Sequence, residues 1–168
     1  MKKSLSVVIV LALCALCAGT SFSQATANQT VNLAVNSVQK IAINGGAVTL
    51  TITAGNAGTD ALTPVSDNST SYSITHNSNS ALRITANLDA PLASGYTLQM
   101  NLTPGVTGGA SAGTVDISNA TSGSAVAVVT GIPKGADANR TITYTFSANA
   151  SAGVMTATVK TVTLTLTN

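Results

Sequence analysis

The chain has 168 residues, of which 45% are hydrophobic and only 7% are charged. Seven Lys and Arg residues stand against five acidic residues, all Asp, and aromatic residues make up 3% of the chain. There is therefore no basic patch for a phosphate backbone and no aromatic row for stacked bases, which argues against nucleic-acid binding. The high apolar content also argues against a disordered chain.

Residues 1–23 have the pattern of a secretory signal peptide. Lys2 and Lys3 precede an apolar run at residues 5–18, and small and polar residues follow that run. The run is shorter than the roughly 20 apolar residues that cross a bilayer. We therefore expect a signal-peptide helix that is cleaved off, and no membrane span in the mature chain.

The position of cleavage defines the mature protein. Small residues are needed at the last and third-last positions of the leader, and Ser21 and Ser23 supply both. Cleavage after Ser23 would leave a single domain of residues 24–168, and cleavage after Ala25 or Ala27 remains an alternative. Such a protein is exported to the periplasm, the outer cell surface or the extracellular space.

Both cysteines, Cys14 and Cys17, lie within this leader. Each follows a leucine, whereas a lipid-modified cysteine usually follows a small residue, so we do not expect a lipid anchor. The mature chain then contains no cysteine, which excludes disulfides, thiolate catalysis and cysteine-bound metals. Loss of Lys2 and Lys3 leaves five basic residues against the five Asp, so the mature chain is neutral.

The remainder reads as a series of short β-strands. Apolar residues alternate with Thr, Ser and Asn, which is typical of half-buried strands. Strands are expected at residues 31–35, 38–43, 48–52, 72–74, 82–88, 96–102, 115–117, 125–130, 142–148 and 162–166. Gly, Pro, Asn and Asp separate these segments, and the Asn/Ser cluster at residues 77–80 indicates a hairpin turn.

About nine or ten such strands predict an all-β fold. With no helix-period segment after the leader, an antiparallel two-sheet β-sandwich is the simplest arrangement. The alternation does not define strand order, so an immunoglobulin-like topology and a jelly roll both remain open.

The C-terminal region carries a resemblance. A small-residue turn at residues 148–153 leads to an alternating Thr/Val/Leu strand at residues 161–167. This region resembles the end of secreted bacterial β-sandwich proteins of the spore-coat-U and fimbrial-subunit type. The resemblance covers about 20 residues and implies a surface or coat component. Those families often carry a disulfide, and fimbrial subunits commonly end near an aromatic residue; this chain has neither.

Candidate chemistry is sparse, and we assign no catalytic residue, cofactor or metal ligand. His76 is the only histidine, and a hydrolase would need it beside an Asp and a Ser. Asp67 with Asn68, and Asp137 with Asn139, offer oxygens that suit calcium. Both clusters read equally well as Asx turns.

We therefore expect a non-catalytic structural or adhesive surface module, with coat-like or fimbria-like roles. The alternative is an extracellular glycan- or ligand-binding sandwich, although the tyrosines occupy apolar-face positions. Strand edges carry few of the charges and prolines that prevent self-association, so edge strands are the expected contacts with further copies or other surface proteins. Residues 30–36 could be donated to a neighbouring subunit, but we favour their being the first strand of their own sheet.

Overall fold

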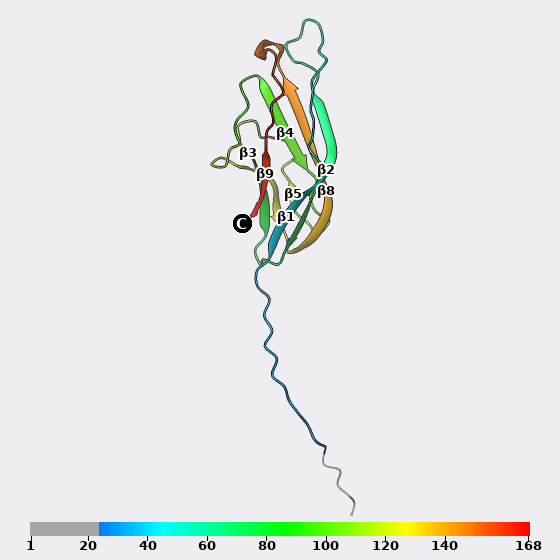
Figure 1. The fold of residues 1–168 in the computed structure, drawn as a ribbon, viewed down its shortest axis with the longest axis vertical. Helices are drawn as coiled ribbons and strands as arrows, with labels where there is room; N and C mark the ends of the chain where they lie inside the picture. Colours follow the sequence, from blue (N-terminus) through cyan, green and yellow to red (C-terminus); the bar gives the residue numbers. More distant parts are fainter. Residues whose placement is uncertain (1–23) are drawn as a thin grey trace, which may run out of the picture. The chain divides into compact units, whose positions relative to one another are not determined.

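The computed structural model describes residues 24–168 (Figure 1). The predicted signal peptide lies outside the described residues. Within residues 24–168 there are nine β-strands and one 3₁₀ turn, η1. They are β1 Gln39–Asn44, β2 Val65–His76, β3 Leu82–Leu88, β4 Tyr96–Leu102, β5 Ala110–Ser111, β6 Val115–Asp116, β7 Val126–Ile132, β8 Gly135–Ala148, η1 Ala150–Ala152 and β9 Val162–Thr167.

The strands form two antiparallel sheets, which confirms the predicted β-sandwich. The five-stranded sheet has the order β1-β2-β8-β4-β6, and the four-stranded sheet has the order β5-β7-β3-β9. The long strands β2 and β8 occupy inner positions in the first sheet, and β1 and β9 are edge strands of different sheets. The unit that contains both sheets comprises Asn36–Asn168.

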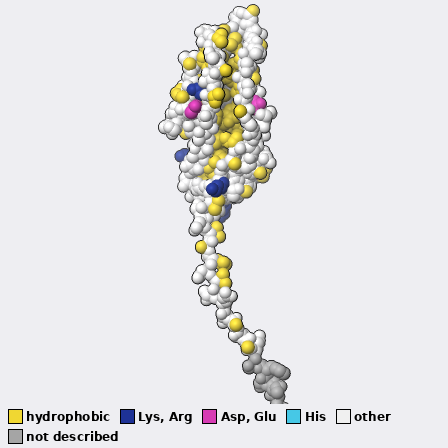
Figure 2. All heavy atoms as spheres, in the orientation of Figure 1, with side chains coloured by type: hydrophobic (Ala, Val, Ile, Leu, Met, Phe, Trp, Pro, Cys, Tyr) yellow, Lys and Arg dark blue, Asp and Glu magenta, His cyan; other side chains and the backbone are white. Residues whose placement is uncertain are grey.

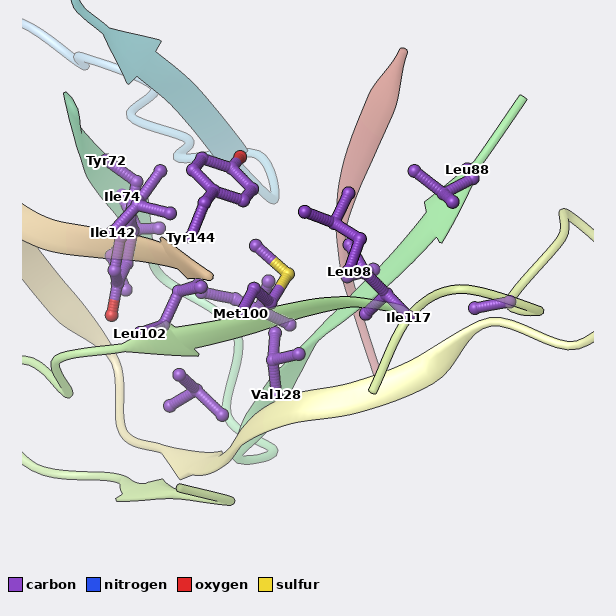
Figure 3. Packing of buried hydrophobic residues seen from close by; sticks show 14 of the residues in the cluster. Tyr72, Ile74, Leu88, Leu98, Met100, Leu102, Ile117, Val128, Ile142 and Tyr144 are labelled. Carbon is purple, nitrogen blue, oxygen red and sulfur yellow. The ribbon is translucent and has the colours of Figure 1, made fainter. Parts of the chain in front are cut away.

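The core lies between the sheets and is almost entirely aliphatic. Every second residue of β3 and β4 points inward, so that Ile84 and Met100 have no exposed surface. Figure 3 shows side chains of β2, β4 and β8 meeting those of β7 and the segment around Ile117. Burial at one face of each strand explains why alternation in the sequence predicted the strands well.

Two predicted strands are absent, and both corrections concern the N-terminal third. Residues 30–36 form no strand, so the expectation that they begin their own sheet is wrong. Residues 48–52 are also without strand pairing, although Val48, Leu50 and Ile52 are half-buried and alternate with exposed threonines. Both segments have the side-chain pattern of a strand but lack a backbone partner among the described residues.

The predicted hairpin at residues 77–80 is also wrong. β2 belongs to the five-stranded sheet and β3 to the four-stranded sheet, so this connection crosses from one layer to the other. A turn-rich cluster between two alternating segments shows where the chain reverses, but not whether the second strand joins the same sheet.

The 3₁₀ turn Ala150–Ala152 is the single helical element within residues 24–168. Accordingly, this part of the chain has no helix with the length and apolar character needed to cross a membrane.

Candidate functional site

His76 lies at the end of β2 and is 2% exposed. Neither ring nitrogen has a hydrogen-bond partner in the structure. The histidine therefore forms no hydrogen bond with an acid that could orient it or with a hydroxyl that it could activate, as a Ser-His-Asp site requires. The geometry does not support the enzyme alternative at this residue.

The two candidate calcium clusters are occupied by donors from the protein itself. Oδ1 of Asp137 accepts a 2.8 Å hydrogen bond from the N–H of Val106, and Oδ2 accepts one from the hydroxyl of Thr107. Oδ1 of Asp67 accepts bonds from the hydroxyl and backbone N–H of Ser69, and these bonds, in that order, lower the pKa of Asp67. Within residues 24–168, no three metal-ligating acids, histidines or cysteines cluster.

The tyrosines do not form a sugar-stacking surface. Tyr72 is fully buried and Tyr144 is 8% exposed. Tyr96 is half-buried and lies parallel to Phe146, with 6.4 Å between the ring centroids, while its hydroxyl donates to the carbonyls of residues 152 and 153. These rings pack within the sandwich and leave no exposed tyrosine pair to bind a glycan.

One side of the sandwich is open, and this opening is the candidate functional site. The edge strands β1 and β9 approach each other there, but β1 pairs only with β2 and β9 only with β3. Figure 2 shows hydrophobic side chains gathered in a lengthwise hollow, in the region that Figure 1 shows between β9 and the β2–β8 pair. Inward-facing residues of β9 remain half-buried at this opening: Val162, Leu164 and Leu166.

Residues 46–53 continue the chain from β1, the edge strand on one side of this opening, and we call this strand-like segment the strap. Its apolar residues Val48 and Leu50 pack against the core, and Thr49 and Thr51 face solvent. No backbone group of the strap forms a hydrogen bond with any other described residue. A half-buried extended segment normally satisfies its N–H and C=O groups with a neighbouring strand, so the strap has the character of a strand whose neighbour is missing.

The segment that leads into β9 also lacks backbone hydrogen bonds. Residues 154–160 make no backbone–backbone hydrogen bond within the described part of the chain. Val154 and Val159 are 98% and 90% exposed. The open side is therefore bordered by free backbone on the strap and along the outer edge of β9.

The described N-terminal residues 24–35, taken by themselves, have the complementary character. They have no regular secondary structure, and all of them are exposed. Val31, Leu33 and Val35 are 66%, 89% and 88% exposed and alternate with polar or small residues. Such a segment carries an apolar face of strand periodicity.

The sequence supplied part of this picture. Alternation identified both the strap and residues 30–36 as strand-like, and few charges defend the edges. No signal in the sequence indicated that the strap and β9 would border the same opening, because their proximity depends on how the two sheets pack.

The fold defines a class: an all-β sandwich of two antiparallel sheets, with an open side between the edge strands β1 and β9. No protein-family model matches this chain, and neither a curated protein nor a solved structure matches it.

Proposed function

We propose that this chain is an exported, non-catalytic structural subunit of a coat or fimbria-like surface assembly. We further propose that copies join by β-strand addition, in which residues 28–36 of one copy enter the open edge of the next. The single observation that carries the proposal is that the strap, whose backbone is unpaired, and β9, whose outer edge is unpaired, border one apolar opening.

The apolar face of residues 28–36 suits that opening. Val31, Leu33 and Val35 share one side of an extended chain and would face the row Val162, Leu164 and Leu166. Full burial of each such side chain is worth roughly 1.5–3 kcal/mol. The inserted backbone would also satisfy free N–H and C=O groups on both borders.

The ends of the sandwich favour an open chain of subunits. β1 starts at Gln39 opposite His76, and β9 finishes at Thr167 opposite Arg83, close to the start of β3. The chain thus enters β1 at the end of the sandwich where β9 finishes. A strand inserted antiparallel to β9 would place the donor's own sandwich beyond the opposite end, which yields a head-to-tail contact that propagates and does not close.

The surface is suited to an extracellular structural role. The outward positions of β8 and β9 carry Thr and Ser, and the chain as a whole has only 7% charged residues. A neutral hydroxyl surface hydrates without attracting counter-ions, and it provides no charge repulsion against further copies.

Leu33→Asp tests the proposal, with Asn32→Asp as the matched control. The full-length precursor is expressed with export, and the exported product is examined by size-exclusion chromatography and negative-stain microscopy. We expect filaments or large oligomers from the parent chain and from Asn32→Asp, because residue 32 would face solvent. Leu33→Asp places the same charge on the apolar face and should leave monomers. A parent chain that stays monomeric at high concentration, or assembly that survives Leu33→Asp, contradicts the proposal.

Cysteine cross-linking tests which side chains of β9 lie next to Leu33 of the inserted strand. Residues 24–168 contain no cysteine, so an engineered pair is the only thiol pair in that part of the chain. Leu33→Cys is combined in separate variants with a cysteine at residue 162, 164 or 166. We expect an intermolecular disulfide in one of these three double variants. Leu33→Cys with Thr165→Cys is the control and should not cross-link, because residue 165 faces the opposite side of β9.

A further inference from the structure

We infer that the strap is a hinged segment that rests on the core in the single chain and swings to admit the incoming strand, after which it pairs with that strand. This inference rests on the proposed function and concerns how entry to the same site is controlled.

The strap is held by side chains alone. Val48 and Leu50 pack against the core cluster, whereas the backbone of residues 46–53 makes no hydrogen bond with the rest of the described chain. By contrast, β1 immediately before it is paired along its full length with β2. Displacement of the strap therefore breaks no backbone hydrogen bond, and local opening should require far less free energy than global unfolding.

Glycines lie at both ends of the strap. Gly45 has φ of +120° and Gly46 follows it, so the chain leaves β1 through two residues with wide conformational freedom. Gly55 and Gly58 follow the strap at its other end, and Gly58 has φ of +83°. The pair Gly45 and Gly46 therefore lets the strap pivot where it leaves β1, whereas Gly55 lies in the anchored part of the chain and Gly58 beyond it.

The far end of the strap is anchored, which limits the motion. The N–H of Thr63 donates a 2.9 Å bond to the carbonyl of Ala54, and Gly55 bridges to Leu62. β1 anchors the near end through its pairing with β2. The movable part is thus confined to the residues that border the opening.

Hydrogen exchange read by mass spectrometry tests the hinge. The acceptor is the Leu33→Asp chain, and the incoming strand is a synthetic peptide of residues 25–36. We expect strap amides to exchange at least about tenfold faster than those of β1 in the acceptor alone, and to become protected when the peptide binds. Strap amides that are already as protected as β1 before peptide is added would overturn the inference.

Gly46→Ala tests whether hinge freedom governs entry. A methyl group at residue 46 meets nothing within 4 Å, so the substitution stiffens the chain without a clash. We expect peptide association to slow by about threefold, with an unfolding midpoint that is unchanged or slightly raised. Gly123→Ala, at a second glycine with open surroundings, should leave the association rate unaltered; equal rates for Gly46→Ala and the parent would refute a hinge at this residue.

The two proposals fail in different ways. If the peptide does not bind the acceptor, strand addition itself is wrong. If the peptide binds at the same rate to all variants and strap exchange is slow throughout, strand addition stands and the hinged strap is wrong.

Discussion

The hydroxyl of Tyr72, on β2, donates a 2.7 Å hydrogen bond to the carbonyl oxygen of Thr103, just after β4. Arg140 adds a 3.0 Å bond from Nε to the carbonyl of Pro104. The loop after β4 is thereby tied to two strands of the same sheet that are not its sequence neighbours. Tyr72 is fully buried, whereas Thr103 lies at an exposed position.

Tyr72→Phe should lower the free energy of unfolding by about 0.5–1.5 kcal/mol, because the hydrogen bond to the Thr103 carbonyl is lost while the ring packing is kept. Urea denaturation measures the change. Tyr96→Phe is the comparison: its hydroxyl bonds lie at a half-buried position, so the loss should be smaller. An equal or larger loss for Tyr96→Phe would contradict this ranking.

Alkaline pH should destabilise the protein through the same residue. Burial raises the pKa of Tyr72 from 10.0 to about 12. The positive charge of Arg140 opposes this shift, and the negative charge of Asp137 adds a smaller increase. The folded state therefore holds this proton more tightly than the unfolded chain, and the stabilisation is complete below pH 10 and is lost as the pH rises towards 12. Unfolding midpoints measured across this range should fall, and Tyr72→Phe should flatten the slope. Burial also raises the pKa of Tyr144, so some slope should persist in that variant.

Asp137→Asn should destabilise the loop at residues 105–107. The carboxylate of Asp137 is 5% exposed and accepts bonds from the N–H of Val106 and the hydroxyl of Thr107. An amide keeps one acceptor oxygen but presents an NH₂ group to the other donor, so we expect a loss of about 1–3 kcal/mol. Asp89→Asn, at an exposed acid, is the control and should cost less. Equal stability of Asp137→Asn and the parent would show that the bonds contribute nothing.

His76→Leu should stabilise the domain. The imidazole is buried and both nitrogens lack partners, so an apolar side chain of similar size should raise the free energy of unfolding by about 1 kcal/mol. His76→Asn retains a polar group and should give no gain. Thermal and urea unfolding compare the two variants, and a clear loss of stability in His76→Leu would mean that the ring makes a bond in solution.

Calcium and chelators should leave the midpoint of thermal unfolding unchanged within about 1 °C. The oxygens of Asp67 and Asp137 already accept hydrogen bonds from residues 69, 106 and 107, and binding of a cation would require those bonds to break. Differential scanning fluorimetry with millimolar calcium or EDTA checks this. A rise in the midpoint with calcium that Asp67→Ala removes would establish a site there.

Period-two alternation of aliphatic and hydroxyl residues was enough to predict the strands of β3, β4 and β9 and the sandwich itself, because one face of each strand must be buried. The scattered acids and the single histidine predict a non-catalytic protein, and this stays a prediction. Each of these inferences depends on local pattern and composition.

Only the tertiary structure decided which strand-like segments have partners. Residues 48–52 and β9 have the same Thr/aliphatic alternation, yet β9 pairs with β3 and residues 48–52 pair with no described strand. Backbone pairing is a long-range property, because it depends on which sheet edge lies next to a segment after the two sheets have packed. The side chains of the segment itself do not specify that edge. For this reason the sequence by itself determined a β-sandwich, whereas the open side between the strap and β9 became visible only in three dimensions.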